Sequence, residues 1–160
     1  MDDPGGPERA DGDGLAYLLV QLGFHVAGKF REQLAPLGLE PRHFGMLTRL
    51  AANEGRSQQA IGELMGLNPT RMVFLVDELE QRGLVERRRN PADRRSYALY
   101  LTEPGRAKLR EAQQASADHA DLVGASLTRP ERRQLTALLR RLAAEQGIAE
   151  GSLPGPPGAG

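Results

Sequence analysis

The chain has 160 residues, with 21 Lys or Arg against 21 Asp or Glu, so its formal net charge is zero. It contains no Cys, which excludes disulfides, thiol nucleophiles, cysteine-ligated zinc and a cysteine redox switch. This length predicts one domain with one hydrophobic core. Neither a signal peptide nor an apolar run of about 18 residues is present, so we expect a soluble, cytoplasmic protein.

Both ends of the chain have compositions typical of disorder. Residues 1–13 are rich in Gly, Pro and Asp, and residues 148–160 in Pro and Gly, so neither segment can bury enough apolar surface to fold. Residues 14–147 are therefore expected to form the domain. Within it we expect a compact core at 40–102, flanked by helices at 15–37 and 103–147.

The first flanking helix is predicted over 15–37, with Pro36 near its end. One side of it carries Leu15, Leu18, Leu19, Leu22, Val26, Phe30 and Leu34. Pro41 then opens a second helix, which is expected to end around 53–55. Its inward residues are expected to be Phe44, Leu47 and Leu50.

Two further helices are predicted after the core. Thr102 begins a polar, Ala-rich helix that reaches about Ala125, and a helix this polar is expected to bridge the domain to something else. Thr128 and Glu131 form a capping-box pattern at the start of a last helix, which Gly147 ends. The stripe of this last helix is Leu135, Leu138, Leu139 and Leu142. No sheet is available to receive these amphipathic helices, so they predict either a bundle within one chain or a two-fold dimer.

The stretch around which the chain is organised runs from Asn68 to Arg82. Asn68 can cap a helix, and Pro69 suits its first position because proline has no N–H to leave unpaired. Gly83 is a typical left-handed stop. The apolar stripe of this helix is Met72, Leu75, Val76 and Leu79. Its opposite side, which is therefore expected to face outward, carries Thr70, Arg71, Val73 and Phe74.

A short helix before this one completes a recognisable pair. Ser57 can cap a helix that runs to about Met65, and Gly66 turns the chain sharply before Asn68. The expected inner face of that helix is Ala60, Ile61 and Leu64. Two helices joined by such a turn match the helix-turn-helix pattern, whose second helix enters the DNA major groove.

A basic hairpin follows the helix pair. Short strands are predicted at 84–85 and 98–101, and the residues 86–95 between them hold five Arg and two acids, a local charge of +3. DNA phosphates commonly stabilise such a concentration of guanidinium groups, and Arg also fits a narrow minor groove. Helix-turn-helix and basic hairpin together describe a winged helix.

The motifs resemble those of the MarR family of bacterial transcriptional regulators over roughly 15–142. The matching runs are Leu67-Asn68-Pro69-Thr70-Arg71, Leu75-Val76-Asp77-Glu78-Leu79-Glu80, Gly83-Leu84-Val85-Glu86-Arg87, and Asp93-Arg94-Arg95-Ser96 followed by Leu99, Leu101, Thr102 and Gly105. The resemblance implies a mainly α fold with a winged helix-turn-helix core, a two-stranded β wing and terminal helices that form a dimerisation region. It also implies a homodimeric repressor that binds an inverted-repeat operator and is released by a small-molecule effector.

The residues expected to contact DNA divide into those that hold phosphates and those that read bases. Arg71 is expected to reach a guanine, and one of Val73 and Phe74 a thymine methyl, with inward packing of one of them as the alternative. Arg94 and Arg95 are expected in the minor groove, while Asp93 orients a neighbouring Arg. The full set is Ser57, Gln58, Asn68, Pro69, Thr70, Arg71, Val73, Phe74, Arg87, Arg89, Arg94 and Arg95.

An effector crevice between the dimer helices and the winged core is implied by the resemblance. Residues that could line it are Tyr17, Phe24, His25, His43, Phe44 and Met46. His25 and His43 could pair with an anionic aromatic ligand. The alternatives are that His25 lies on a polar helix face and that His43 makes a local cap. The His residues are far apart in sequence, so no metal site is expected, and no cofactor is expected either.

Two other classes of function stay open from the sequence. An enzyme is disfavoured, because we find no phosphate-binding Gly loop, no nucleophile motif and no paired carboxylates in a recognisable setting. A winged-helix module that binds an acidic protein partner through the Arg-rich hairpin would retain the same fold.

Overall fold

The computed structural model describes residues 12–90 and 96–148, which fold mainly as helices with one two-stranded antiparallel sheet. The elements are α1 (Gly12–Leu34), a 3-10 turn η1 (Ala35–Leu37), α2 (Pro41–Ala51), α3 (Gln58–Leu64), α4 (Pro69–Gln81), β1 (Val85–Arg89), β2 (Tyr97–Leu101), α5 (Glu103–Val123) and α6 (Arg129–Glu145). This order confirms the predicted winged helix-turn-helix with additional terminal helices. In the described part of the chain, no helix is both long and apolar enough to span a bilayer.

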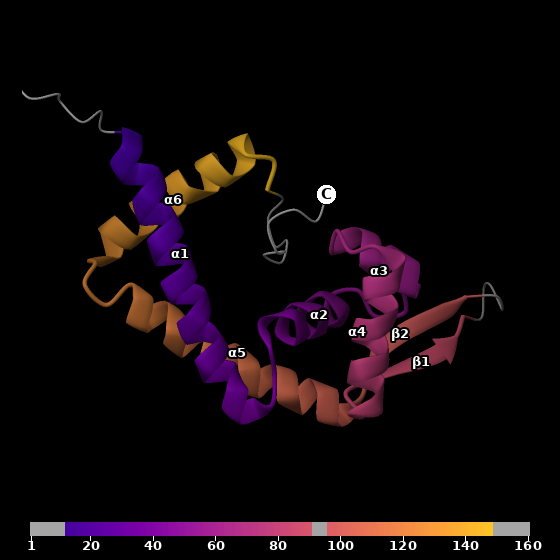
Figure 1. The fold of residues 1–160 in the computed structure, drawn as a ribbon. Helices are drawn as coiled ribbons and strands as arrows, with labels where there is room; N and C mark the ends of the chain where they lie inside the picture. Colours follow the sequence, from indigo (N-terminus) through magenta and orange to yellow (C-terminus); the bar gives the residue numbers. More distant parts are fainter. Residues whose placement is uncertain (1–11, 91–95, 149–160) are drawn as a thin grey trace, which may run out of the picture.

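The molecule is elongated, with the predicted winged helix at one end and the terminal helices at the other (Figure 1). α3, α4 and the two strands gather at one end, whereas α1 and α6 extend to the other. α5 runs from the sheet along α1 toward α6 and contacts both α1 and α2. As expected from its polar sequence, this helix bridges the two ends of the molecule.

The helix-turn-helix pair forms as its local sequence predicts. The Asn68 side chain accepts the Arg71 N–H at 2.9 Å, and the Ser57 hydroxyl accepts the Ala60 N–H at 3.2 Å, so both helices are capped. Gly66 and Gly83 have φ of 64° and 68°, the left-handed region in which a side chain is strained. These glycines turn the chain before and after α4.

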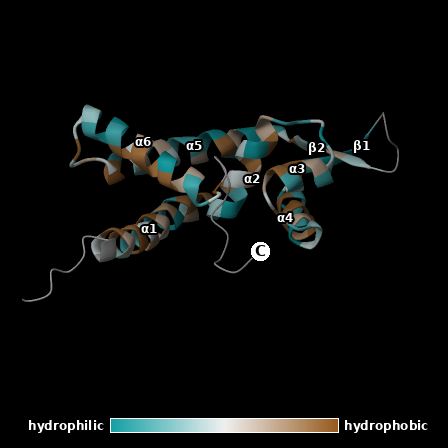
Figure 2. Cartoon of the chain, turned by 90° about the horizontal axis from the view of Figure 1, so that it is seen from above, coloured by the Kyte–Doolittle hydropathy of each residue, from teal (hydrophilic) through white to brown (hydrophobic). Residues whose placement is uncertain are grey.

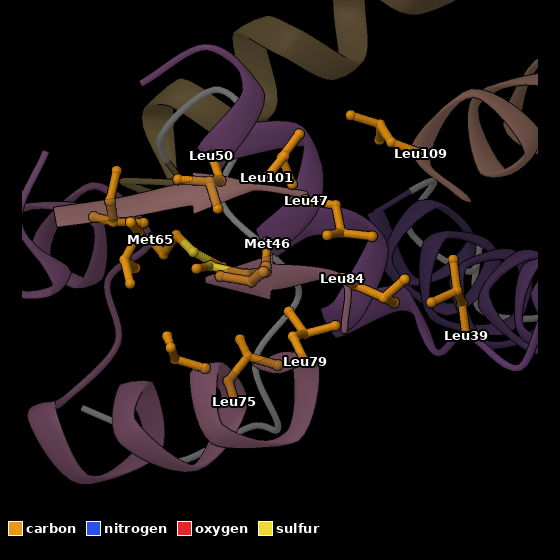
Figure 3. Packing of buried hydrophobic residues seen from close by; sticks show 14 of the residues in the cluster. Leu39, Met46, Leu47, Leu50, Met65, Leu75, Leu79, Leu84, Leu101 and Leu109 are labelled. Atoms are coloured by element: carbon orange, nitrogen blue, oxygen red, sulfur yellow. The ribbon is translucent and has the colours of Figure 1, made fainter. Parts of the chain in front are cut away.

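The core lies between α2, α4 and the sheet (Figure 3). All four residues of the α4 stripe are buried in one cluster with Met46, Leu47 and Leu50 of α2, and Figure 3 shows Leu75 and Leu79 on the side of α4 toward Met46. Val85 and Leu99 close the core from the strands. The apolar stripe thus fixes which side of α4 is left for solvent.

Some predicted details of the helices were wrong. Leu64 is 41% exposed rather than internal, because the inward positions are those of Ile61 and Gly62 in α3 and of Met65 directly after it. The first helix stops at Leu34 and continues as the 3-10 turn, since Pro36 cannot donate a helical hydrogen bond. At its start, α1 includes Gly12, which the composition assigns to the tail. The other residues expected to be disordered, apart from Asp13 and Ile148, lie outside the described ranges.

The wing strands are longer than predicted. They pair from Val85 with Leu101 to Arg89 with Tyr97, so three arginines lie in β1 and not in the turn. The Arg88 guanidinium lies 4.5 Å from the Tyr100 ring centroid, a cation–π contact that favours the extended pairing. The Ser57 backbone makes an isolated β-bridge to Ala98 of β2, which joins the start of α3 to the sheet.

Candidate DNA interface

The outward side of α4 is open to solvent. Thr70 and Arg71 are exposed in its first turn, as predicted. Val73 is 41% exposed and Phe74 70% exposed, so neither packs into the core and the inward alternative is wrong for both. This face therefore presents one cation, one hydroxyl and an aromatic ring on a rigid support.

The start of α3 lies next to the wing. Ser57 is confirmed as a helix cap, and its backbone is tied to β2. The Gln58 side chain accepts a hydrogen bond from the Nε of Arg87 on β1 at 3.0 Å. Whether either residue also holds a phosphate stays a prediction.

Arg87 is placed differently from the other wing arginines. Its side chain is only 18% exposed. It contacts Asp77 Oδ1 at 2.5 Å and pairs with Glu80, both on α4, while its backbone N–H also donates to Glu80 at 3.1 Å. The residue predicted to touch DNA thus joins β1 to α3 and α4. By comparison, Arg89 is exposed on the same strand, and Arg94 and Arg95 lie outside the described residues.

The acidic residues of α4 are balanced by cations of the same chain. Arg87 faces Asp77 and Glu80, and Arg42 Nη2 lies 3.3 Å from the Glu78 carboxylate. A close contact with His43 lowers the pKa of Glu78, helped by the charges of Arg42 and Arg82, while partial burial opposes the effect. Carboxylates that would repel a phosphate backbone are therefore neutralised within the protein.

The six residues expected to line an effector crevice fall into two groups. Tyr17, Phe24 and His25 are exposed on α1, as the polar-face alternative for His25 requires. On α2, Met46 is fully buried in the core, and His43 is 2% exposed. The Nδ1 of His43 accepts the Glu40 N–H at 3.0 Å, which confirms the alternative that it makes a local cap.

A partly buried aromatic cluster at the junction of α1, α2 and α5 was not predicted. We call Phe30, Phe44 and His119 the aromatic junction. Phe30 stacks on His119 at a centroid distance of 5.3 Å and meets Phe44 edge-on at 5.7 Å. His119 is 9% exposed, and its Nε2 is buried without a hydrogen-bond partner. Its place in a polar, Ala-rich run gave no signal for this burial.

No group of three His, Asp or Glu residues able to hold a metal ion occurs within residues 12–90 and 96–148. The exposed side of α4 and the neighbouring arginines of β1 form a surface that fits a DNA duplex.

Comparison with known proteins agrees with this arrangement. Residues 37–96 match the model of the MarR family. A putative transcriptional regulatory protein for the hcr operon of Thauera aromatica is 35% identical over 76% of this chain and 78% of its own. The transcriptional repressor CouR bound to a 23-mer DNA duplex is similar, with 35% identity, a TM-score of 0.76 and coverage of 87% of this chain and 99% of that one.

A second structure, CouR of Rhodococcus jostii RHA1 bound to p-coumaroyl-CoA, is 32% identical with a TM-score of 0.69. It covers 85% of this chain and 96% of that one. The relatives named here are regulators of transcription, in agreement with the prediction of a regulator rather than an enzyme.

Proposed function

The chain belongs to the MarR family of DNA-binding transcriptional regulators, and from this premise we propose that it is a repressor that binds an inverted-repeat operator as a homodimer. The observation that carries the proposal is the solvent-exposed side of α4, held by a buried stripe and flanked by the wing. Arg71 would read a guanine, and Phe74 a thymine methyl. Arg89, Arg94 and Arg95 would contact phosphates or insert into the minor groove.

A mobility shift on the region upstream of the gene, with random duplex as competitor, tests the proposal. We expect a shifted complex that random duplex displaces only in large excess. The same protein with Arg71→Ala should lose most of this discrimination. A complex that random duplex displaces at equal concentration would reduce the proposal to nonspecific DNA binding, and absence of any complex would favour the acidic-protein alternative.

The exposed apolar residues of α1 support a homodimer. One side carries Leu15, Leu18, Leu19 and Leu22, and the opposite side carries Tyr17, Val20 and Phe24. These seven side chains are between 39% and 77% exposed. A helix that is apolar on two sides requires partners on both, and its own α5 contacts α1 on only part of its surface. Figure 2 shows hydrophobic residues along both α1 and α6.

The apolar stripe of α6 is open as well. Leu135, Leu138 and Leu139 are 41% to 42% exposed in the single chain. A second copy would cover both surfaces at once and would set two α4 helices about 34–36 Å apart, the spacing of successive major grooves.

Sedimentation at micromolar concentration tests the dimer. Leu138→Glu should give a monomer, because a charge would enter the apolar stripe. Leu64→Glu is the matched control, since Leu64 is equally exposed (41%) but lies on α3. If the Leu138→Glu variant still sediments as a dimer, the apolar stripe of α6 is not part of the interface.

A small aromatic acid or its thioester is the effector class that we propose. The observation in its favour is the aromatic junction, where two rings and an unsatisfied His119 nitrogen meet between α1, α2 and α5. CouR, a similar protein, binds p-coumaroyl-CoA. Of the residues expected to contact a ligand, Phe44 belongs to this junction, and Tyr17, Phe24, His25, His43 and Met46 stay predictions.

Titration of the operator complex with p-coumaroyl-CoA, p-coumarate and free CoA tests this part. Release by the first or second compound, but not by CoA alone, is expected. His119→Phe keeps the stacking surface but lacks both ring nitrogens, so it should bind operator and resist release. If neither aromatic compound releases the operator, the effector class is wrong.

A further inference from the structure

His43 has neighbours that fix the position of its proton. Its Nδ1 lies 3.0 Å from the Glu40 N–H group and 3.4 Å from Arg82 Nη1. Both of these groups can only donate, so Nδ1 must accept and carries no proton. The single proton of the neutral ring is therefore on Nε2. Because the ring is 2% exposed, solvent does not compete for either nitrogen.

The protonated nitrogen faces the recognition helix. Nε2 lies 3.1 Å from Glu78 Oε1 on α4, and the N–H points away from the direct line, so the contact is electrostatic rather than a well-aligned hydrogen bond. Arg82, directly after α4, donates from Nη2 to the Gly38 carbonyl at 2.7 Å. We call these contacts, made by Gly38, Glu40 and His43 with Glu78 and Arg82, the α2–α4 seam.

The next residue of α2 faces the other way. Phe44 meets Phe30 of α1, which in turn stacks on His119 of α5. One turn of α2 thus contacts the recognition helix through His43 and the aromatic junction through Phe44. Two neighbouring residues of α2 therefore connect α4 with the aromatic junction.

The seam adds a directional constraint to the one that the core imposes on α4. The buried stripe fixes which side of α4 faces the core, and polar contacts, which depend on direction as apolar burial does not, define its rotation more finely. Glu78 follows Arg71 by seven residues, two turns or about 10.5 Å along the axis, and so lies on nearly the same side of the helix. A rotation of α4 at Glu78 would therefore turn Arg71 by the same angle.

We propose that His43 is a positioning residue for DNA recognition, which sets the rotation of α4 through Glu78 and couples it through Phe44 to the aromatic junction. The first half needs only DNA binding, whereas the coupling gains a regulatory meaning from the effector that we propose above. Neither half requires His43 to touch DNA or ligand.

The first experiment compares operator affinity with affinity for random duplex, using the operator located by footprinting of the upstream region. His43→Ala should reduce their ratio by about threefold to tenfold, within the range of effects between contacting residues. His43→Gln, whose amide can place an N–H group near Glu78, should restore part of the ratio. Arg42→Ala, which removes an exposed partner of Glu78, is the control: it should weaken binding to both duplexes alike and leave the ratio nearly unchanged.

Melting temperatures distinguish an effect of each substitution on folding from an effect on the position of α4. All binding is measured well below the melting temperature of each variant, as followed by circular dichroism. A merely structural role would lower the melting temperature and leave the ratio intact, and that result would overturn the proposal. If His43→Ala does not fold, Glu78→Gln takes its place, because Glu78 is 40% exposed and its change leaves the core untouched.

The coupling is tested without any effector by a double-mutant cycle. Phe44→Leu perturbs the aromatic junction, and its effect on the affinity ratio is measured with Glu78 present and with Glu78→Gln. We expect a clear effect in the first background and a smaller one in the second. Additive effects would overturn the coupling, and this result is independent of whether p-coumaroyl-CoA releases the operator.

Discussion

Arg87 and Asp77 are joined across the base of the wing, with Nη2 of Arg87 2.5 Å from Oδ1 of Asp77. Glu80 and Gln58 hold the rest of the same guanidinium. One side chain thus links β1 to both helices of the helix-turn-helix pair. It fixes where the wing starts relative to the recognition helix, and it neutralises two acids that would otherwise stand beside DNA.

Loss of this clamp should lower stability as well as DNA affinity. Arg87→Ala leaves Asp77 and Glu80 without their cation, and we expect the free energy of unfolding to fall by about 1–2 kcal/mol, since both carboxylates are partly screened by water. Urea denaturation measures the change. Arg89→Ala, on the exposed part of the same strand, is the matched control and should weaken operator binding at nearly unchanged stability. Equal destabilisation by both variants would contradict the clamp.

Unlike Arg87→Ala, Arg71→Ala should weaken operator binding and leave the free energy of unfolding nearly unchanged. Arg71 is exposed in the first turn of α4, and its guanidinium has no part in the core. Its removal should cost roughly 1–3 kcal/mol of operator binding and relax preference at one base pair in each half-site. Fluorescence anisotropy with single-base variants of the operator gives both quantities. Affinity that falls equally for every sequence would show a phosphate contact instead of base readout.

Phe74 should read a thymine methyl group. The ring is 70% exposed on the same side of α4 as Arg71. Replacing the contacted thymine by uracil removes one methyl, which should cost about 0.8 kcal/mol, or roughly fourfold in affinity. The uracil effect should vanish with Phe74→Ala. If uracil costs the same in both proteins, Phe74 does not make the contact.

The recognition helix could be predicted from the sequence because its determinants are local. Asn68, the four-residue stripe and Gly83 lie within 16 residues, and each acts through helical periodicity or a backbone cap. The outward side then follows from the inward one. Even so, periodicity placed Leu64 inside, although Ile61, Gly62 and Met65 are the residues that this segment buries.

The pairing of Arg87 and the burial of His119 could not be predicted in this way. Arg87 meets Asp77 only after α4 and β1 have packed, and a charge-rich run looks the same whether its arginines face solvent or acids. His119 lies on a polar helix whose buried side is decided by Phe30, 89 residues earlier in the chain. Such contacts depend on tertiary packing rather than on spacing along the sequence.

The contact between His43 and Glu78 should appear in the pH dependence of stability. The pKa of Glu78 is lowered chiefly by His43, with Arg42 and Arg82 adding to the effect. A carboxyl group whose folded-state pKa lies below its ordinary value of 4.5 contributes its full stabilisation above that pH. The contribution is lost as the pH falls through the folded-state value, where Glu78 becomes protonated in both states. Because Glu78 is 40% exposed, we expect less than about 1 kcal/mol.

Urea denaturation of the native protein and Glu78→Gln between pH 7 and pH 3 measures this contribution. The native protein should be the more stable at neutral pH, and the difference should disappear in the acid range below the ordinary carboxyl pKa. In a His43→Ala background the same comparison should give a smaller difference at neutral pH, because the main cause of the lowered pKa is gone. A difference that persists unchanged at pH 3 would assign the effect of Glu78→Gln to packing rather than to charge, and the electrostatic tie between α2 and α4 would be lost.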